Sequence, residues 1–556
     1  MIFAAPNSQS CAAWLLGAAC LSSLVVPHTR ADTVQARFPA APRFPENTFT
    51  RMFPTLHSFG PQDNAERLLV EAIGAISGIV DAGDIPGVTN PRNPDNPAMT
   101  AGFTFLGQFL DHDITFDKRS AINATADPYR TINFRTPAFD LDSVYGMGPD
   151  GSPEYYQSDQ VSFRVEPIPG SDKASLAGVI RFDHPRDSNN NSIIPESRND
   201  ENLMVSQLHL GFMLFHNAVV ANLRSQPKYK HAHPRRLFKD ARQIVTYHYQ
   251  WIIVHQFLPT TIGQNVVDSI LQGGLKFYNP LRFPFQLKQL DQVLSLADDD
   301  QFGSSAASLA HTRRTLPLVP IEFSVAAYRF GHSQVRPGYR ANFGGPAGVP
   351  PAFAPLVFNN SISPTDPDPN DLRGTHRAAR RFIDWQTFFP MAPNLQGSIV
   401  PLHNKKIDTN VSSPLFNLPG QQAPLDGLPS SGPSALPARN LARHVNFAIP
   451  SGQAIASFMG ETPLVVPRLS PFGLNTSTPL WYYCLFEAET TQQGERLGPV
   501  CGRIVGEVFI GLLKFDRNSY FNLAPHFVPF LPSAVPGNFT ISDLLTFAGV
   551  VFPLGL

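Results

Sequence analysis

The segment TAGFTFLGQFLDHDITFD, residues 100–117, is apolar and aromatic except for a short cluster of polar side chains. Helical spacing places Gln108, Asp111 and His112 at positions i, i+3 and i+4, so these side chains share one helix face, whereas Asp113 points elsewhere. Carboxylates are costly to bury in apolar surroundings unless something binds or neutralises them. A single histidine or aspartate on such a face is usually a hydrogen-bonded core residue, so this segment alone does not define a site.

A second acidic cluster follows in RTPAFDLDSVYG, residues 135–146. Asp140 and Asp142 alternate in a proline-containing loop, and Thr136 lies just before them. Calcium ions bind several oxygens from carboxylates, hydroxyls and backbone carbonyls, and an irregular loop can supply this mixture. Taken alone, however, an Asp-x-Asp loop is more often a turn than a metal site.

Composition limits the class of partner. The chain has 556 residues, of which 42% are hydrophobic and 16% charged, with a formal net charge of −1. It therefore lacks the basic surface that binding to nucleic acid requires. These values are typical of a globular protein, and we expect a small-molecule partner.

Helical periodicity dominates the sequence, and strand-like alternation is scarce. In the segment 65–76, an apolar stripe that includes Leu68, Ile73 and Ile76 predicts one amphipathic helix. Further helices are predicted at 100–116, 201–224, 241–258, 324–335 and 451–460, and as a pair within 478–515. Proline-, glycine- and asparagine-rich tracts between them read as surface loops. We therefore expect a mainly α fold: a single large helical domain with long irregular loops.

The N-terminal segment 1–31 predicts a secretory signal, because the apolar run CAAWLLGAACLSSLVV precedes small residues at Thr29 and Ala31. Its first ten residues contain no Lys or Arg, which leaves an uncleaved anchor or a different start site as alternatives. No later run is expected to be long and apolar enough to span a bilayer, so we expect no stable membrane insertion. The remaining chain, 32–556, would be the helical domain and would be secreted.

Cleavage of the signal would leave only Cys484 and Cys501, which lie at similar distances from the turn between the last two helices. Antiparallel packing could bring them together as a disulfide. Two buried free thiols are an equal alternative.

Five segments, taken in order, resemble the animal-type haem peroxidases of the cyclooxygenase–peroxidase superfamily. Residues 100–117 resemble the distal helix of that family and 135–146 its calcium loop. Residues 195–217 resemble the segment with the distal arginine, 326–337 the one with the proximal histidine, and 438–460 the one with the asparagine that orients it. The resemblance extends from about residue 50 to residue 550.

On the distal side, this resemblance makes His112 the base that takes a proton from hydrogen peroxide and delivers it to the leaving oxygen. Gln108 would hold water, peroxide or a halide, and Arg198 would provide positive charge as the O–O bond breaks.

On the proximal side, His332 would be the ligand of the haem iron. Asn440 would accept the other ring N–H of this histidine, which fixes its tautomer. Arg329, three residues before His332, would pair with a haem propionate.

Asp111 and Glu201 match the two carboxylates that can form ester bonds to haem b in this family. An ester carries no charge, so it would avoid the cost of a buried carboxylate. Asn202 departs from the mammalian myeloperoxidase type, which has a methionine there that forms a third, sulfonium link. That link should be absent.

The resemblance also implies a calcium ion that ties the distal helix to the loop. Its expected ligands are Asp113, Thr136, Asp140 and Asp142 through side-chain oxygens, and Ala138 through its backbone carbonyl.

The implied function is a secreted haem peroxidase that reduces hydrogen peroxide and oxidises a halide, a pseudohalide or a small organic donor. An alternative is a haem-dependent fatty-acid dioxygenase that uses Tyr328 as a radical. The spacing from Tyr328 to His332 is one residue longer than the Tyr-x-x-His pattern of those enzymes. A further alternative is a non-catalytic matrix or adhesion protein with the same fold.

Overall fold

The computed structural model describes residues 47–279, 317–419 and 433–556, except residues 86, 123 and 364. The predicted signal segment 1–31 lies outside this range. All described residues belong to one compact unit.

Long helices form the framework. They are α1 (Asn64–Ile73), α2 (Gly102–Ile114), α6 (Leu203–Arg224), α7 (Pro234–Ile252), α9 (Gln264–Gly273), α14 (Leu436–Asn446), α15 (Gly452–Met459), α16 (Leu480–Gln492), α17 (Pro499–Phe515) and α19 (Ile541–Phe547). Short helices fill the connections: α3 (Asp142–Tyr145), α4 (Gly148–Gly151), α5 (Ser171–Ala174), α8 (Leu258–Ile262), α12 (Ile321–Ser324), α13 (Pro393–Gln396) and α18 (Tyr520–Leu523).

Strands are few among the described residues. β1 (Asp95–Thr100) pairs antiparallel with β4 (His403–Lys405), with Asp95 opposite Lys405 and Thr100 opposite His403. β2 (Glu166–Pro167) pairs antiparallel with β3 (Phe182–Asp183). The β1–β4 pair lies directly before α2, so it fixes the point at which this helix enters the core.

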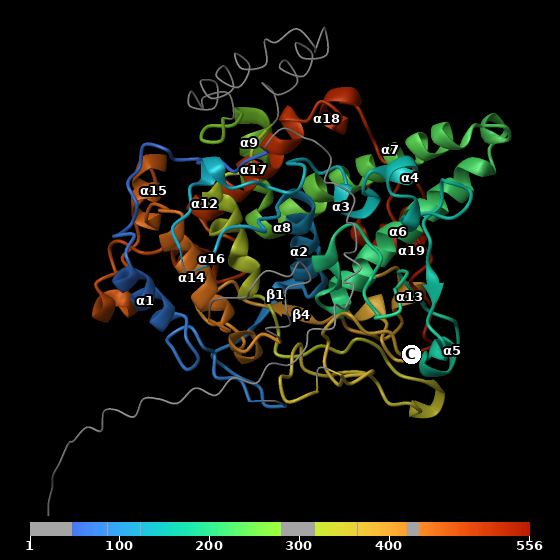
Figure 1. Cartoon of the computed structure of the whole chain (residues 1–556), viewed down its shortest axis with the longest axis horizontal. Coiled ribbons are helices and arrows are strands. Elements are labelled where there is room, and N and C mark those ends of the chain that lie inside the picture. The colour runs from blue at the N-terminus through green and yellow to red at the C-terminus, as the bar shows by residue number, and fades with distance from the viewer. Residues whose placement is uncertain (1–46, 86, 123, 280–316, 364, 420–432) are drawn as a thin grey trace, which may run out of the picture. The chain divides into compact units, whose positions relative to one another are not determined.

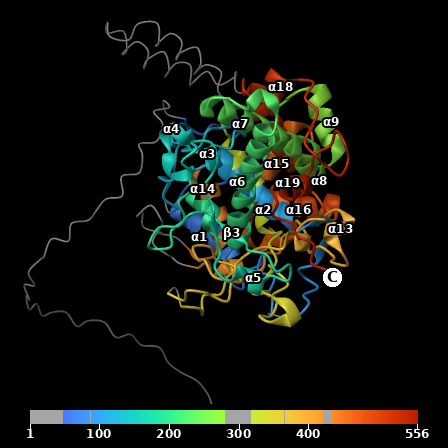
Figure 2. The ribbon, with the colours of Figure 1, turned by 90° about the vertical axis from the view of Figure 1, so that its right-hand side faces the viewer.

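Helices α2 and α6 pack against each other at the centre of the fold (Figures 1 and 2). Helix α6 begins after Asn202, whose side chain accepts a hydrogen bond from the Val205 N–H and so caps the helix. Contrary to the sequence expectation, α6 is long and apolar enough to cross a membrane. Most of it is buried inside the protein, as is usual for a core helix.

Two predicted helices are interrupted. The helix expected at 241–258 continues from α7 into a π-helical turn, η5 (Ile253–Phe257), and then into α8. The helix expected at 324–335 is instead α12 followed by a 3₁₀ segment, η7 (Ala327–His332). The backbone leaves helical geometry at Ala326, where φ is −132° and ψ is −78°. Tertiary hydrogen bonds from Tyr328 and to Arg329 hold η7 in place, and such contacts override local helix propensity.

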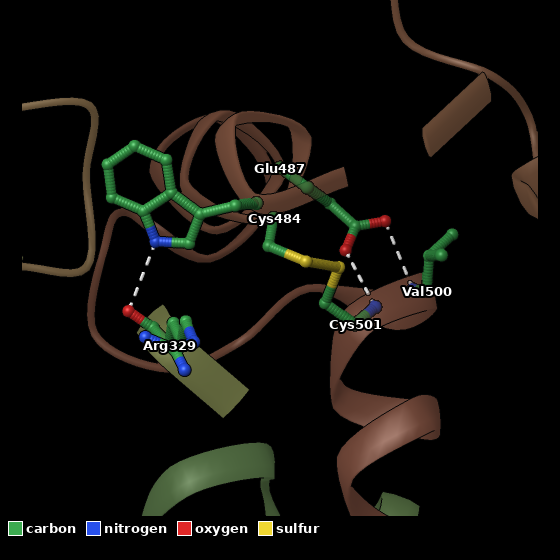
Figure 3. Close-up of a disulfide and its surroundings, with 6 residues drawn as sticks. Arg329, Cys484, Glu487, Val500 and Cys501 are labelled. Carbon is green, nitrogen blue, oxygen red and sulfur yellow. Dashed lines mark hydrogen bonds between the residues drawn. A yellow bond between two sulfur atoms is a disulfide. The ribbon is translucent and has the colours of Figure 1, made fainter. Parts of the chain in front are cut away.

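The last helix pair is joined by a disulfide between Cys484 of α16 and Cys501 of α17 (Figure 3). The Glu487 carboxylate accepts hydrogen bonds from the Val500 and Cys501 N–H groups at the start of α17. The alternative of two free thiols is therefore wrong. One turn before Cys484, the Trp481 indole donates to the Arg329 carbonyl, which ties α16 to η7.

Candidate functional site

His112, the predicted distal histidine, lies near the end of α2 and is held by an amide. Nδ1 of His112 is 2.8 Å from Oδ1 of Asn199, which belongs to the 3₁₀ turn η3 (Ser197–Asp200). The Asn199 amide nitrogen is 2.9 Å from Nδ1 of His209 on α6. Burial, followed by the charge of Arg198, lowers the pKa of His112 to about 3, so the ring is neutral. Its Nε2 makes no hydrogen bond within the described residues and is not enclosed, so it faces open space.

Arg198 lies against the carboxyl end of the same helix. Its Nη2 donates to the carbonyls of Thr115 and His112 at 2.5 and 3.3 Å, and its Nε is 2.9 Å from the Glu196 carboxylate. Although burial opposes it, Arg135 and Arg198 hold the pKa of Glu196 below its usual value, so this buried acid is ionised. Nη1 of Arg198 makes no hydrogen bond in the described part of the chain, and it remains available to a ligand.

Gln108 lies one turn before His112, on the same face of α2 as expected. Its Oε1 accepts a hydrogen bond from Nδ2 of Asn202 at 3.2 Å. Because its oxygen is thus engaged, the amide NH₂ of Gln108 is free to donate to a ligand. Asn202 therefore orients this glutamine and also caps α6. It occupies the position at which the mammalian myeloperoxidase type has the methionine of the sulfonium link.

The proximal segment η7 places Arg329 and His332 on one side, because residues i and i+3 eclipse in a 3₁₀ helix. Nδ2 of Asn440 on α14 is 2.8 Å from Nδ1 of His332, and Oδ1 of Asn440 accepts from Nη1 of Arg329 at 3.3 Å. The expected pairing of His332 with Asn440 is therefore present, but its direction is reversed. The amide nitrogen donates to the ring, because Arg329 holds the amide oxygen.

His332 also has a free nitrogen. Burial, followed by Arg329, lowers its pKa to about 3. Its Nε2 makes no hydrogen bond among the described residues and is not enclosed. A Cβ built on the neighbouring Gly331 would meet no atom within 4 Å, so the segment borders open space.

Two further carboxylates were predicted for the site, Asp111 and Glu201. Burial raises the pKa of Asp111, which receives a hydrogen bond from Thr115 and feels the charges of both Arg198 and Arg329. Burial raises the pKa of Glu201 to about 7, yet its side chain is accessible and makes no hydrogen bond within the described residues.

Tyr328 closes the side of the site between α2 and η7. Its hydroxyl donates to the Gly107 carbonyl at 3.0 Å, and burial followed by Asp111 raises its pKa. The tyrosine therefore belongs to the site's wall and is a neutral phenol.

The acidic cluster forms as expected. Carboxylate oxygens of Asp113, Asp140 and Asp142 lie within 4.8 Å of one another. Burial and the charge of Asp142 raise the pKa of Asp113 to about 7 and that of Asp140 well above its usual value. Thr136 lies beside the cluster and donates through Oγ1 to Asp142 at 3.0 Å. Ala138 is buried in the same loop.

Several residues of the site were not predicted. Glu196 and Asn199 lie close to Arg198 within residues 195–217, and their polar side chains beside that arginine were the only sign of them in the sequence. Ser143 and Tyr249 donate to Asp113 through their hydroxyls at 2.6 and 3.0 Å. Tyr249 is on α7, far from the loop in sequence, and local patterns carry no sign of that contact.

The family model for animal haem peroxidase matches residues 118–347, which include the acidic loop, Arg198 and His332. A peroxidase-like protein of Margaritifera margaritifera is 28% identical over 155 residues, which span 28% of this chain and 15% of that protein.

Solved structures also match. Peroxidase A from Dictyostelium discoideum aligns over 91% of this chain and 95% of its own, with a TM-score of 0.56 and 16% identity. The fatty acid alpha-dioxygenase of Oryza sativa aligns over 89% and 79%, with a TM-score of 0.52 and 14% identity. At such identities the likeness concerns the fold, and it confirms the mainly α architecture.

Proposed function

We propose that the chain, whose residues 118–347 match the family model for animal haem peroxidase, is a haem peroxidase that reduces hydrogen peroxide and oxidises a small donor. The observation that carries this proposal is the pair of neutral histidines, His112 and His332, whose Nε2 atoms both face open space. A neutral imidazole nitrogen can serve as a base on one side of a haem and as an iron ligand on the other.

The residues of the site fit a haem. Nε2 of His332 has no hydrogen-bond partner within the described residues and can bind iron once its proton moves to Nδ1. Gly331 leaves room beside it, and Arg329, on the same side of η7, would pair with a propionate. A bound haem would supply the redox chemistry that splits the O–O bond. His332 would hold this group through Nε2.

On the distal side, Nε2 of His112 takes one proton from hydrogen peroxide and returns it to the oxygen that leaves as water. Nη1 of Arg198 and the NH₂ group of Gln108 donate to the peroxide oxygens and stabilise the charge that develops there. Glu196 holds Arg198 beside His112, and Asn202 holds Gln108 with its donor group free.

Asp111 and Glu201 are proposed as ester attachments for haem b. Both have raised pKa values because they are buried, and Glu201 has no hydrogen-bond partner among the described residues. Ester formation would remove the buried charge. After brief turnover with hydrogen peroxide, acid–acetone extraction should leave haem on the wild type and release it from D111A/E201Q. Complete release from active wild type would exclude the esters.

The acidic cluster is proposed to bind Ca²⁺ through Asp113, Thr136, Asp140 and Asp142, with the carbonyl of Ala138. A cation would relieve the repulsion that raises the carboxyl pKa values, and oxygen-only ligands suit calcium. Since Asp113 directly follows His112, the ion would fix the end of α2.

The donor class is tested by a panel. Stopped-flow reduction of the peroxide-oxidised protein by bromide, iodide, thiocyanate and a phenol should give a fast reaction with at least one of them. Absence of any reaction with peroxide would contradict a peroxidase and favour a non-catalytic protein of the same fold.

The dioxygenase alternative rests on Tyr328 and on structural neighbours that are fatty acid alpha-dioxygenases. Stoichiometric O₂ uptake with linoleate, lost in Tyr328→Phe, would favour it. A peroxidase predicts no such uptake and unchanged peroxide reactivity in this variant.

We propose that the protein is exported. The apolar segment within 1–31 and the disulfide between Cys484 and Cys501 both suit an oxidising compartment. Fractionation of the source cells with N-terminal sequencing should find the mature chain outside the cytosol. An intact N-terminus in the cytosol would contradict export.

A further inference from the structure

The distal histidine is in contact with a buried side chain to which neither the sequence pattern nor the comparisons give a role. Asn199 is fully buried between His112 of α2 and His209 of α6. Its two amide ends face different rings: the oxygen is 2.8 Å from Nδ1 of His112, and the nitrogen is 2.9 Å from Nδ1 of His209.

The direction of this amide determines where His112 carries its proton. A carbonyl oxygen only accepts hydrogen bonds, so Nδ1 of His112 must be the N–H that donates to it. A neutral imidazole has one N–H, so Nε2 is left with its lone pair. That nitrogen is the one that faces open space, where a proton is to be taken from the substrate.

The nitrogen end of the amide faces His209. Because the Asn199 NH₂ group donates to Nδ1 of His209, this ring carries its proton on Nε2, which is enclosed without a partner. Buried polar groups without partners are rare and costly. The arrangement therefore places an unpaired group at His209, away from the reacting end of His112.

The turn that carries Asn199 is anchored on both sides. Arg198 pairs with Glu196, and the Asp200 carboxylate accepts from Arg186 at 2.7 Å and from Ser206 at 3.0 Å. Asn199 thus sits on a rigid support, which is what a positioning group needs to hold its partner within a narrow range of orientations.

We propose that Asn199 is a positioning residue that, held by His209, keeps the lone pair of His112 Nε2 directed at the substrate side of the site. This inference rests on the proposed function, because it assigns the tautomer of the proposed base. Hydrogen cyanide offers a second probe: it transfers its proton to a distal base when cyanide binds to haem iron, and it needs no peroxide chemistry.

The test compares Asn199→Leu with Asn199→Asp in haem-loaded protein. Leucine has a similar size and no acceptor, whereas aspartate keeps an oxygen at the position that faces Nδ1. Loss of an outer partner of this kind typically costs about 10- to 100-fold in activity. We expect losses of that size, per haem, in the rates of peroxide reaction and cyanide binding for Asn199→Leu, and rescue of both rates by Asn199→Asp.

Ser197 lies on the same turn and makes no hydrogen bond within the described residues. Ser197→Ala therefore serves as the matched control, and we expect it to have wild-type rates. Haem content and melting temperature are measured for every variant. A merely structural role predicts a lower melting temperature with unchanged rates per haem in Asn199→Leu, and this result would overturn the proposal. Equal losses in Asn199→Leu and Asn199→Asp would also overturn it.

His209→Leu keeps the proposal testable if Asn199→Asp does not load haem. It leaves Asn199 and His112 in place and removes only the group that receives the amide N–H, so a smaller loss of both rates supports the proposal and unchanged rates overturn it. If wild-type protein binds cyanide but does not react with peroxide, the proposed function fails, while the cyanide rates of the variants still decide the role of Asn199.

Discussion

The distal and proximal histidines are held in the same way but with opposite polarity. Each is buried or half-buried, has a pKa lowered to about 3, and contacts one asparagine amide through Nδ1 at 2.8 Å. Asn199 presents its oxygen to His112, whereas Asn440 presents its nitrogen to His332. The distal ring therefore has a free lone pair on Nε2, and the proximal ring carries its proton there.

This difference indicates which half of the site is already arranged for its chemistry. A base needs the lone pair that His112 already has. A metal ligand also needs an unprotonated Nε2, so on the proximal side the proton must move to Nδ1 and the Asn440 amide must turn. Arg329 opposes that turn because it donates to the Asn440 oxygen. If Arg329 pairs with a propionate, the amide is released.

The largest expected effect follows from removal of the proposed iron ligand on the proximal side. His332→Ala removes the proposed iron ligand, so the protein should lose most of its haem or show a shifted Soret band. Haem content and the absorption spectrum measure this. His112→Ala is the control, because the distal base does not hold the iron and its haem content should stay near wild type. An unchanged spectrum in His332→Ala would show that another residue is the ligand.

The next effect concerns the polarity of the proximal amide. Asn440→Asp can only accept from Nδ1, so it should keep haem and lower the reduction potential by making His332 more electron-rich. Asn440→Leu offers no acceptor and should weaken haem binding about 10- to 100-fold. Haem titration measures the haem affinity of both variants, and redox potentiometry measures their reduction potentials. Equal haem affinity in both variants would mean that Asn440 does not act through its oxygen.

Calcium should affect the distal half alone. In the metal-free fold, burial and Asp142 raise the pKa of Asp113 from 3.8 to about 7, so the folded state binds this proton more tightly than the unfolded state. Stability therefore falls as pH rises from about 4 to 7 and stays low above it. A cation that replaces the proton should stabilise most above pH 7, and a ligand at 100 times its Kd adds about 2.7 kcal/mol.

Melting temperatures with calcium and with a chelator, at pH 5 and pH 8, test this. The calcium-dependent increase should be larger at pH 8, and chelation should slow the peroxide reaction while haem stays bound. Asp140→Ala should behave like the chelated protein. If calcium raises the melting temperature equally at both pH values, or if the protein is active without calcium, the proposed calcium site is wrong.

The smallest expected effect concerns the contact between Trp481 and Arg329 on the proximal side. Trp481→Phe removes the indole that donates to the Arg329 carbonyl at 3.1 Å and leaves the disulfide of α16 in place (Figure 3). One neutral hydrogen bond contributes about 1 kcal/mol. Haem affinity should fall slightly, and the rate of peroxide reaction per haem should not change. A slower reaction with unchanged affinity would place the influence of Trp481 on the distal side.

Local spacing predicted the parts of the site that lie on one element or in one loop. The shared face of Gln108, Asp111 and His112 follows from helical geometry alone. The meeting of Asp113 with Asp140 and Asp142, by contrast, required the family resemblance. The same resemblance paired His332 with Asn440 through the asparagine oxygen, whereas in the structure this oxygen accepts from Arg329 and the amide nitrogen faces Nδ1 of His332. The Arg329 contact depends on the fold.

Tertiary contacts explain the other differences. Leu68 in α1 and Ile76 beyond its end, both of the predicted stripe, are exposed. Arg67 of α1 is buried, and its guanidinium donates to Asn446 of α14. The contact of Asn199 with His112 links positions 87 residues apart. Periodicity carries no information about such pairs, so sequence reasoning proposed roles for the two histidines but none for Asn199, which contacts His112.

The central claim, that His112 is the base of a haem peroxidase, is tested most directly by stopped-flow spectroscopy of the haem-loaded protein mixed with hydrogen peroxide. General base catalysis typically contributes about 10²- to 10⁴-fold. We predict a rapid change of the Soret band in the wild type. In His112→Ala, which should retain its haem, the reaction with hydrogen peroxide should be slower by that factor. Equal rates in the two proteins, or no reaction in the wild type, would contradict it.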